Sequence, residues 1–418
     1  MSVRAGIVVT GTEVLGGLIS DANGPWLSGQ LRAHGVELAH TIVVGDRPDD
    51  LVAALDFFRD VDVVITSGGL GPTADDLTAD VVASWVGASM VLDPALEARV
   101  WAIVTRLRAR VGGEEAAMRA GARKQAHVPT GAAVLEPAGT APGFILGESP
   151  MVVVLPGPPR ELQSMWADAV TTEPLRGLLA GAGELEQRIL RFFPLPEPQI
   201  AATLRELDAA SLPLEVTTCL RRGELELATV FTPSVAADYE AFEAALRERH
   251  GDVLFSDDGA TIDEVVVGLL DGRTLATAES CTGGLMAGRL TDRAGSSAYV
   301  LGGLVVYSNE AKASLAGVPA ALIEAHGAVS PEVAAALAAG ARSRYDADIG
   351  IGITGIAGPG GGTPDKPVGT VCLCIASSDA SEERTVRLPG SRRDVRDRTT
   401  TVALHMLRSL LLRAALRV

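Results

Sequence analysis

The stretch RTLATAESCTGG, residues 273–284, passes from an apolar strand pattern into a polar corner and then into a pair of glycines. Three more strand patterns follow it, at residues 302–307, 349–354 and 369–376, with helical patterns between them. Alternation of strands and helices is typical of a sheet covered by helices. We therefore expect residues 258–418 to form an α/β domain.

The amino-terminal part shows the same alternation, which begins near residue 6 and ends in a short buried-type strand at 151–155. It predicts a parallel sheet with helices on its faces, over residues 1–170. Residues 171–257 follow the order strand, helix, strand, strand, helix, strand, which is the split βαβ arrangement of a small α+β domain. We assign this middle segment a connecting or dimerising role and expect a homodimer.

Composition narrows the possible partners of the chain. Its 418 residues include 36 Lys and Arg against 52 Asp and Glu, and the formal net charge is −16. Affinity for nucleic acid rests on basic side chains that displace counterions, so no nucleic-acid partner is expected. Every long apolar stretch is interrupted short of a membrane span, so no membrane partner is expected either.

Two further features favour a cytoplasmic location. The short apolar run at the amino terminus leads directly into Gly11 without a cleavage region, so we interpret it as a first strand and not as an export signal. The four cysteines have no CxxC spacing, which fits a reducing compartment.

The corner at residues 278–284 is a candidate active site. Backbone N–H groups are unpaired where a strand gives way to a helix, and Gly283 and Gly284 let a substrate carbonyl approach them closely. Ser280 is expected at the carboxyl edge of the sheet, where open α/β sheets bind ligands. The corner thus predicts an oxyanion site beside a serine nucleophile. The alternative is that Ser280 only caps the helix.

The sequence YSNEAK, residues 307–312, follows the next strand. Ser308 is expected to cap a helix, which places Lys312 in the first turns of that helix. A cation is disfavoured at that end by the helix dipole, and partial burial would lower the pKa of the lysine further. Lys312 is therefore a candidate general base, although most lysines are solvated surface residues.

A glycine-rich loop, TGIAGPGGGT at residues 354–363, follows the third strand. Such loops hold phosphate or ribose with main-chain donors. A GxGxxG pattern at residues 350–355 lies inside the strand and no helix follows it, so we do not interpret it as a dinucleotide-binding motif.

These three motifs, with HGAVS at 326–330 and GSR at 390–392, closely resemble the nicotinamide-nucleotide amidase domain of the CinA (competence/damage-inducible protein A) family. The resemblance covers essentially all of residues 258–418. It implies that nicotinamide mononucleotide is hydrolysed to nicotinic acid mononucleotide and ammonia by a serine–lysine mechanism, with no cofactor.

The resemblance also implies a role for each matching residue. Ser280 would attack the carboxamide, Lys312 would activate it and Tyr307 would assist proton transfer. The substrate would be bound by Gly283, Gly284, Thr354, Gly358 and Arg392. Among these, Thr354 and the backbone of the two adjacent glycines would polarise the carbonyl, and Arg392 would hold the phosphate.

Cys281 is the rival nucleophile, because a thiol beside a helix N-terminus is open to activation. The one histidine that accompanies it is His326, whose surroundings look like a turn, so Ser280 is preferred. The remaining cysteines, Cys219, Cys372 and Cys374, are expected to be small core residues.

A second glycine-rich stretch, TSGGLGPTADDLT at residues 66–78, follows a buried strand and opens a helix. Glycine N–H groups and a helix N-terminus form an anion cradle, and Asp75 and Asp76 offer oxygen ligands to Mg²⁺ or a similar hard cation. Phosphate with a divalent metal is the natural inference. The alternative is that one of the aspartates only caps the helix.

With GTE at 11–13, DAN at 21–23, KQA at 124–126, GTAPG at 139–143 and LPGPPRE at 155–161, this stretch resembles the molybdopterin-binding-like domain of CinA proteins. The resemblance implies a three-layer α/β fold and metal-dependent cleavage of ADP-ribose or related dinucleotide pyrophosphates. It implies metal ligands at Asp75, Asp76 and Glu13, and nucleotide contacts at Gly69, Gly71, Thr73 and Lys124. One departure is Gly121-Ala122-Arg123, where the family usually has an asparagine ahead of the Lys-Gln pair.

Two functions compete at this point. The first is a bifunctional enzyme of pyridine-nucleotide recycling, whose partners are small pyridine and adenine nucleotides. The second is a non-catalytic scaffold that binds a pterin or nucleotide in a competence or DNA-damage response. The acidic composition disfavours direct work on DNA, and the complete set Ser280, Tyr307 and Lys312 favours the enzyme.

Overall fold

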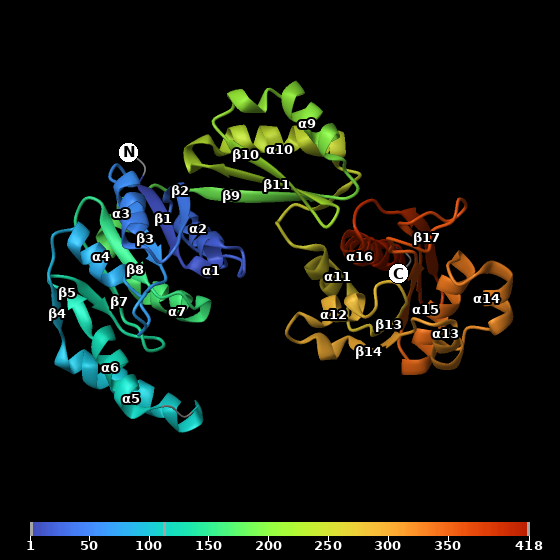
Figure 1. The fold of residues 1–418 in the computed structure, drawn as a ribbon. Helices are drawn as coiled ribbons and strands as arrows, with labels where there is room; N and C mark the ends of the chain where they lie inside the picture. The colour runs from blue at the N-terminus through green and yellow to red at the C-terminus, as the bar shows by residue number, and fades with distance from the viewer. Residues whose placement is uncertain (1–2, 112–113, 416–418) are drawn as a thin grey trace. The chain divides into compact units, whose positions relative to one another are not determined.

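The structure is a computed structural model that describes residues 3–111 and 114–415. It divides into two compact units, Met1–Glu186 and Gln187–Val418 (Figure 1).

The first unit is built on a six-stranded sheet with the order β2-β1-β3-β8-β7-β6. Its strands are β1 (Arg4–Thr10), β2 (Glu37–Val44), β3 (Val63–Ser67), β6 (Ala133–Leu135), β7 (Gly143–Leu146) and β8 (Met151–Leu155). Strands β1, β2, β3 and β8 are parallel, whereas β7 pairs antiparallel with β8 and β6 pairs antiparallel with β7. A separate pair is formed by β4 (Met90–Leu92) and β5 (His127–Pro129).

Helices cover both faces of this sheet, because successive strand residues point to opposite sides. Ile7 packs in one core with Leu27 and Trp166, and Val8 packs in another with Leu55 and Val82. The helices are α1 (Thr12–Leu15), α2 (Asn23–Ala33), α3 (Pro48–Phe57), α4 (Thr78–Trp85), α5 (Pro94–Val111), α6 (Glu115–Gln125), α7 (Pro159–Ala169) and α8 (Leu175–Ala180). The predicted three-layer α/β fold is confirmed.

The second unit begins with a four-stranded sheet of order β10-β11-β9-β12. Its elements are β9 (Glu186–Phe192), α9 (Glu197–Glu206), a short 3₁₀ helix (Ala209–Ser211), β10 (Glu215–Arg221), β11 (Glu224–Phe231), a second 3₁₀ helix (Pro233–Val235), α10 (Ala236–His250) and β12 (Leu254–Ser256). Both α-helices lie on one face of the sheet (Figure 1), where Ile200 and Phe242 share a core with Leu225. The predicted split βαβ arrangement is confirmed.

The rest of the second unit surrounds a five-stranded sheet of order β14-β13-β15-β16-β17. Its strands are β13 (Leu275–Glu279), β14 (Val300–Val305), β15 (Ile349–Gly355), β16 (Thr370–Ala376) and β17 (Ser381–Arg387). The first three are parallel to one another, and β16 and β17 run antiparallel.

The helices of this region are α11 (Ile262–Leu270), α12 (Leu285–Thr291), a 3₁₀ helix (Ser296–Ala298), α13 (Asn309–Ala316), α14 (Ala320–His326), α15 (Pro331–Tyr345) and α16 (Arg392–Ala415). Val266 and Leu407 pack on one face of the sheet, and Val333 and Leu337 pack on the other. The predicted caps are confirmed, because Ser308 accepts from the Ala311 amide and Ser330 accepts from the Val333 amide. The α/β fold predicted here is also confirmed.

Packing extends the first unit beyond the expected boundary at residue 170. Leu175 belongs to its core, and Leu178 and Ala182 pack against that core. The segments expected as a middle and a carboxy-terminal domain share the second unit, although each has its own sheet. Within residues 3–111 and 114–415, no helix is long and apolar enough to span a membrane.

Candidate functional site

The ends of three neighbouring parallel strands bring the expected residues of the second unit to one edge of its sheet. Ser280 directly follows β13, and its amide donates to the Ile353 carbonyl of β15 at 2.9 Å. On the other side of β13, the Val306 amide donates to the Glu279 carbonyl at 2.8 Å. The segments that carry Ser280, Tyr307 and Thr354 therefore leave the sheet side by side.

Ser280 is buried, yet its hydroxyl has no hydrogen-bond partner among the described residues. Helix α12 begins after Gly284, and no side chain of its N-cap residue closes it. The alternative that Ser280 serves only as a helix cap is therefore wrong.

Glu279 accepts hydrogen bonds from the backbone amides at the start of α12, a role that was not predicted from the sequence. Its side chain is 1% exposed, and its carboxylate accepts from the amides of Gly284, Met286 and Ala287 at 3.0, 3.0 and 2.8 Å. Three amide donors at a helix N-terminus stabilise a buried carboxylate. The signal in the sequence was a Glu immediately before Ser280 and five residues ahead of Gly284.

These bonds correct the role expected for the two glycines. The Gly284 amide is held by Glu279, and the Gly283 amide donates to the Ser280 carbonyl at 3.1 Å. Neither amide is free to polarise a substrate carbonyl in this geometry. The glycines are needed for another reason, because their φ values of +57° and +91° lie in the left-handed region.

Lys312 lies in the first turn of α13 and is 2% exposed. Its Nζ donates to the Tyr307 carbonyl at 3.2 Å. Burial lowers the pKa of Lys312 below its ordinary value, and the nearby Cys281 thiol and Glu310 carboxylate oppose that shift. The burial and the direction of shift that were expected are both present, and they favour the neutral amine that a base requires.

Cys281 is unsuited to the role of nucleophile. Its side chain is buried, and burial raises the pKa of its thiol to about 12. A β-carbon added at Gly355 would lie 3.0 Å from its sulfur, so the thiol is packed against β15. At neutral pH such a thiol holds almost no thiolate, which is the reactive form.

Two arginines of α16 tie the loops of the edge together. Arg392 donates to the Tyr307 hydroxyl at 2.7 Å and to the Gly358 carbonyl at 2.8 Å. Arg396 donates to the carbonyls of Cys281 and Thr282 at 3.1 and 2.7 Å. Sequence reasoning missed Arg396, although its position four residues after Arg392 places both on one face of a helix. Tyr307 itself is 59% exposed, as a group that meets a ligand should be.

The hydrogen bond of Thr354 corrects a second expected role. Its buried hydroxyl donates to the Ala328 carbonyl at 2.7 Å, so its only proton cannot also polarise a substrate carbonyl. Lys366, which was not expected, holds the same region by donating to the carbonyls of His326 and Val329 at 2.9 and 2.7 Å. Both side chains brace the glycine-rich loop.

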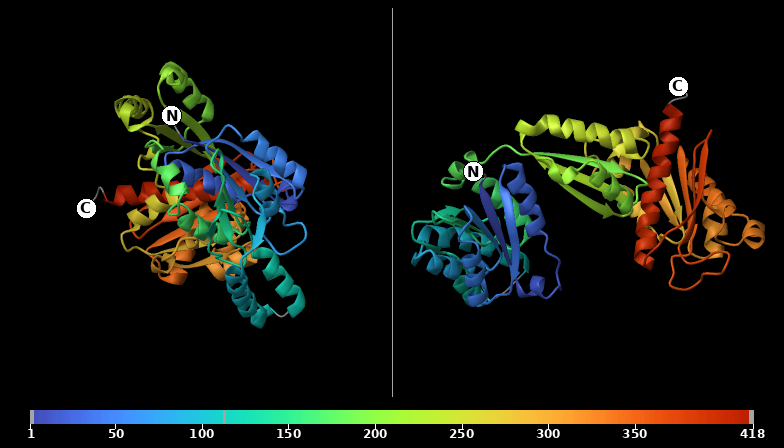
Figure 2. Two further views of the ribbon diagram at one scale, coloured as in Figure 1. Left: turned by 90° about the vertical axis from the view of Figure 1, so that its left-hand side faces the viewer. Right: turned by 90° about the horizontal axis from the view of Figure 1, so that it is seen from above.

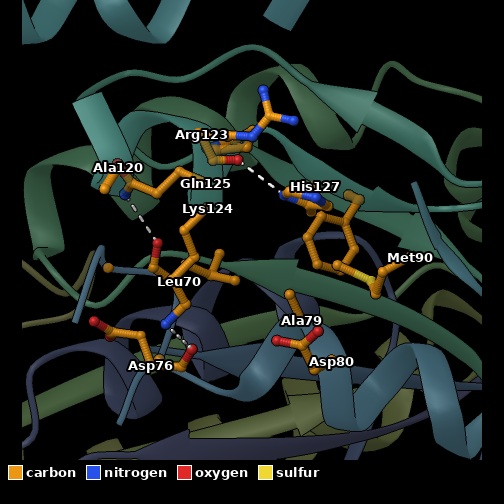
Figure 3. Close-up of a pocket in the computed structure, with 14 residues that line it drawn as sticks. Leu70, Asp76, Ala79, Asp80, Met90, Ala120, Arg123, Lys124, Gln125 and His127 are labelled. Carbon is orange, nitrogen blue, oxygen red and sulfur yellow. Dashed lines mark hydrogen bonds between the residues drawn. The ribbon is translucent and has the colours of Figure 1, made fainter. Parts of the chain in front are cut away.

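In the first unit, two adjoining cavities open at the carboxyl edge of the parallel strands, with volumes of about 450 and 620 Å³. They share five lining residues, Gly69, Leu70, Gly71, Asp76 and Gln125. Figure 3 shows the smaller one, where Lys124 bonds to Asp76 and Gln125 bonds to Leu70. The expected glycine stretch therefore forms the wall between two cavities.

The glycines of this wall are required by close approach. A β-carbon at Gly69 would lie 2.0 Å from the Thr78 hydroxyl, at a φ of +68°. A β-carbon at Gly71 would lie 2.4 Å from the Asp76 carboxylate. Larger residues would displace the loop from both aspartates.

Thr73 and Lys124 hold the loop through hydrogen bonds, and Lys124 also lines the smaller cavity. The Thr73 amide donates to Asp76 at 2.8 Å, and the Thr73 hydroxyl bonds to the carboxylates of both Asp75 and Asp76. Lys124 donates to the carbonyls of Thr73 and Asp76. The aspartates also do not cap α4, since that helix begins at Thr78 without a side-chain cap.

The expected metal trio does not form. Glu13 lines the larger cavity with Asp75 and Asp76, but the described part of the chain holds no group of three His, Cys, Asp or Glu side chains arranged for a metal. Two carboxylates that share one hydroxyl still suit Mg²⁺, which is often bound by one or two carboxylates together with substrate phosphates. The Thr73 hydroxyl holds the pKa of Asp75 below its ordinary value, which favours the ionised carboxylate.

The departure at Gly121 proves to be a packing feature. A β-carbon at Gly121 would lie 2.7 Å from Cβ of Pro72, so α6 lies directly against the glycine loop. This approach brings Lys124 and Gln125 onto loop carbonyls, the latter at 3.0 Å from the Leu70 oxygen.

Two further residues line the larger cavity without a predicted role. Asn23 is buried and donates to the Ser67 hydroxyl and the Gly157 carbonyl at 2.8 and 2.7 Å. Burial raises the pKa of Glu161, which reaches the same cavity from α7. The DAN and PPRE motifs were the signals that contained them.

Fold and site together define a protein of two units. The first is a three-layer α/β unit in which a glycine-rich loop separates two cavities, and the second has a serine and a buried lysine at the edge of its sheet. Comparison with known proteins matches residues 6–175 to the probable molybdopterin binding domain and residues 260–411 to the CinA C-terminal domain. The chain belongs to the CinA family.

The full-length relatives support this membership over the whole chain. A CinA-like protein of Mycolicibacterium vanbaalenii is 56% identical over 418 residues, which cover 98% of this chain and 99% of the relative. One of Mycobacterium tuberculosis is 54% identical over 422 residues, covering 98% of each. A solved competence/damage-inducible protein of Agrobacterium tumefaciens is 40% identical and covers 37% of this chain and 99% of its own, with a TM-score of 0.35.

Proposed function

We propose that the second unit is a nicotinamide-nucleotide amidase, which hydrolyses nicotinamide mononucleotide to nicotinic acid mononucleotide and ammonia. The observation that carries this proposal is Lys312, a buried lysine with a lowered pKa at the sheet edge that also presents the unpartnered Ser280 hydroxyl. Serine is a weak nucleophile unless a base takes its proton, and a neutral lysine supplies that base.

In the proposed reaction, Lys312 takes the proton of the Ser280 hydroxyl while Oγ bonds to the carboxamide carbon. The tetrahedral adduct collapses, the C–N bond breaks and the leaving nitrogen is protonated to ammonia. In this scheme Tyr307 supplies that proton. The Tyr307 hydroxyl oxygen accepts a hydrogen bond from Arg392, so the hydroxyl hydrogen stays free to be donated. Water then hydrolyses the ester, which releases nicotinic acid mononucleotide and restores the Ser280 hydroxyl. The proton held by Lys312 passes to Tyr307, so both side chains return to their starting forms.

Arg392 is proposed to bind the phosphate of the substrate. Two of its N–H groups are engaged by Tyr307 and Gly358, and the remaining ones can meet an anion near the glycine-rich loop. The purified chain should release one ammonia for each nicotinic acid mononucleotide formed. Absence of both products from nicotinamide mononucleotide would overturn the proposal and favour a non-catalytic scaffold.

A second activity is proposed for the first unit, the cleavage of ADP-ribose or a related dinucleotide pyrophosphate. It is supported by Asp76, which lines both adjoining cavities, and by Asp75, which lines the larger one; together the two cavities would accommodate the two halves of such a ligand. These carboxylates, with diphosphate oxygens, would hold a divalent cation, which would neutralise charge and activate water. Formation of AMP from ADP-ribose in the presence of Mg²⁺ tests this activity.

A further inference from the structure

A third cavity, of about 420 Å³, lies in the second unit, apart from the sheet edge that carries Ser280. It forms where the turn between β10 and β11 meets α16 and the end of β17, and Figure 2 shows the small sheet beside α16. Four arginines line it, Arg222, Arg384, Arg387 and Arg398, and no acidic residue does so among the described residues.

The positive charge of this cavity is only partly compensated. The side chains of Arg222 and Arg387 make no hydrogen bond or ion pair with any described residue. Arg384 pairs with Glu382 at 3.0 Å, and Arg398 donates to the Pro389 carbonyl at 3.1 Å. Four guanidinium groups around one cavity repel one another unless an anion lies among them. Such a set is notable in a chain whose net charge is −16.

The β10–β11 turn gives independent support. Arg221 and Glu224 are opposite each other in the antiparallel β10–β11 ladder. Arg222 and Gly223 are therefore the two residues of the hairpin turn, with φ values of +53° and +93°. Turns of this kind prefer Asn-Gly, because a positive φ is unfavourable for a side chain as large as arginine. Residues in such conformations cluster at ligand sites. Here Arg222, which has the unfavourable backbone conformation, places its guanidinium group in the lining of the cavity.

The floor of the cavity is apolar. Phe193, Val386, Leu388 and Val402 line it, and Phe193 is fixed by stacking on His405 with ring centroids 3.8 Å apart. A cavity of 420 Å³ lies within the range of about 300–1,000 Å³ found for small-molecule sites. Arginine binds phosphate through paired N–H groups and also stacks on planar rings.

We propose that this cavity is a binding site for a nucleoside phosphate, distinct from the two candidate catalytic sites. Arg222 and Arg387 bind its phosphates, and the base lies against Phe193 and the neighbouring aliphatic side chains. The proposal does not depend on either proposed activity.

Photo-crosslinking of the full-length chain with 8-azidoadenosine diphosphate, followed by peptide mapping, tests the site directly. Mapping is needed because the first unit has cavities of its own. We expect labelled peptides that contain Phe193 or residues 386–402. Excess ADP and, more weakly, inorganic pyrophosphate should suppress this label, whereas adenosine should not.

The variant Arg222→Ala/Arg387→Ala should lose this label by about ten-fold or more, since each lost charged hydrogen bond weakens binding several-fold or more. The matched control Arg221→Ala/Arg344→Ala also loses two exposed arginines of the same unit, but neither lines the cavity. It should keep the label. An unchanged thermal midpoint of unfolding in both variants shows that they fold. Absence of label from these peptides, or equal label in both variants, would overturn the proposal.

Discussion

The side-chain amine of Lys312 is removed from water by the fold, since the residue is 2% exposed and the one side-chain hydrogen bond that it makes with the described residues goes to a backbone carbonyl. Burying a charge without a counter-ion is costly, and the usual outcome is a shift toward the neutral form. That cost has a purpose if the neutral amine acts on Ser280.

The variant Lys312→Arg separates a base from a mere positive charge. A guanidinium stays protonated and cannot accept the serine proton, so ammonia release should fall by about 10²-fold or more, as far as in Lys312→Ala. Rates of ammonia release by both variants, with thermal unfolding as the check on folding, measure this. An arginine variant that keeps most of the activity would make Lys312 an electrostatic or structural residue.

The dependence on pH follows from the same residue. Burial lowers the pKa of Lys312 from an ordinary value of 10.5, so the rate of ammonia release should rise with pH through this lowered pKa and be lost below it. Its contribution to stability has the same sign: it is present above pH 10.5 and lost as pH falls through the folded-state pKa.

At the scale of an element, the start of α12 depends on one carboxylate. Glu279→Ala would leave three amide donors without an acceptor, of which the Met286 amide is buried and the other two are part-buried. A buried donor costs about 1–3 kcal/mol when its partner is removed. We expect a lower free energy of unfolding and slower ammonia release, because the corner after Ser280 is held by these bonds. The exposed Glu324→Ala serves as the control in urea titration, and equal stability of the two variants would contradict this role.

Helix α6 offers a second test at this scale. Gly121→Ala places a β-carbon 2.7 Å from Pro72, which should push the helix away from the glycine loop and weaken the bonds of Lys124 and Gln125. Cleavage of ADP-ribose should fall while ammonia release stays unchanged. Gly29→Ala is matched to it, because the added carbon at that helical glycine meets nothing within 4 Å. Loss of ADP-ribose cleavage in both variants, or in neither, would contradict the proposal that close packing of Gly121 against Pro72 holds the glycine loop.

At the scale of the whole molecule, the two units should respond separately to removal of metal. A chelator should abolish cleavage of ADP-ribose and added Mg²⁺ should restore it, because the proposed metal ligands Asp75 and Asp76 lie together beside a cavity of the first unit. Asp75→Ala/Asp76→Ala should lose this activity and keep ammonia release. Cleavage that persists in chelator, or in the double variant, would show that the aspartates serve only the Thr73 turn.

The architecture could be predicted because it follows from patterns along the chain, such as the strands before Ser67 and Ser280. Ser280 was expected at the carboxyl edge of the sheet, and Tyr307 and Thr354 at the ends of two other strands; because parallel strands end at one edge of a sheet, the structure brings the three segments together. The partners of individual groups could not be predicted. Whether the Gly284 amide meets a substrate or Glu279, and whether Thr354 donates to a ligand or to Ala328, depends on distances of a few ångström in the folded chain.

The proposed amidase activity depends on Ser280 as the nucleophile. The most direct test of this role is the rate of ammonia release from nicotinamide mononucleotide by variants at Ser280 and at the neighbouring Cys281. Ser280→Ala should lose the activity with its fold intact, because no hydrogen bond of the described structure involves the serine hydroxyl. Cys281→Ala should keep it, apart from a modest loss of stability, since its thiol is buried with a pKa of about 12. Ammonia release that survives in Ser280→Ala and disappears in Cys281→Ala would contradict the account.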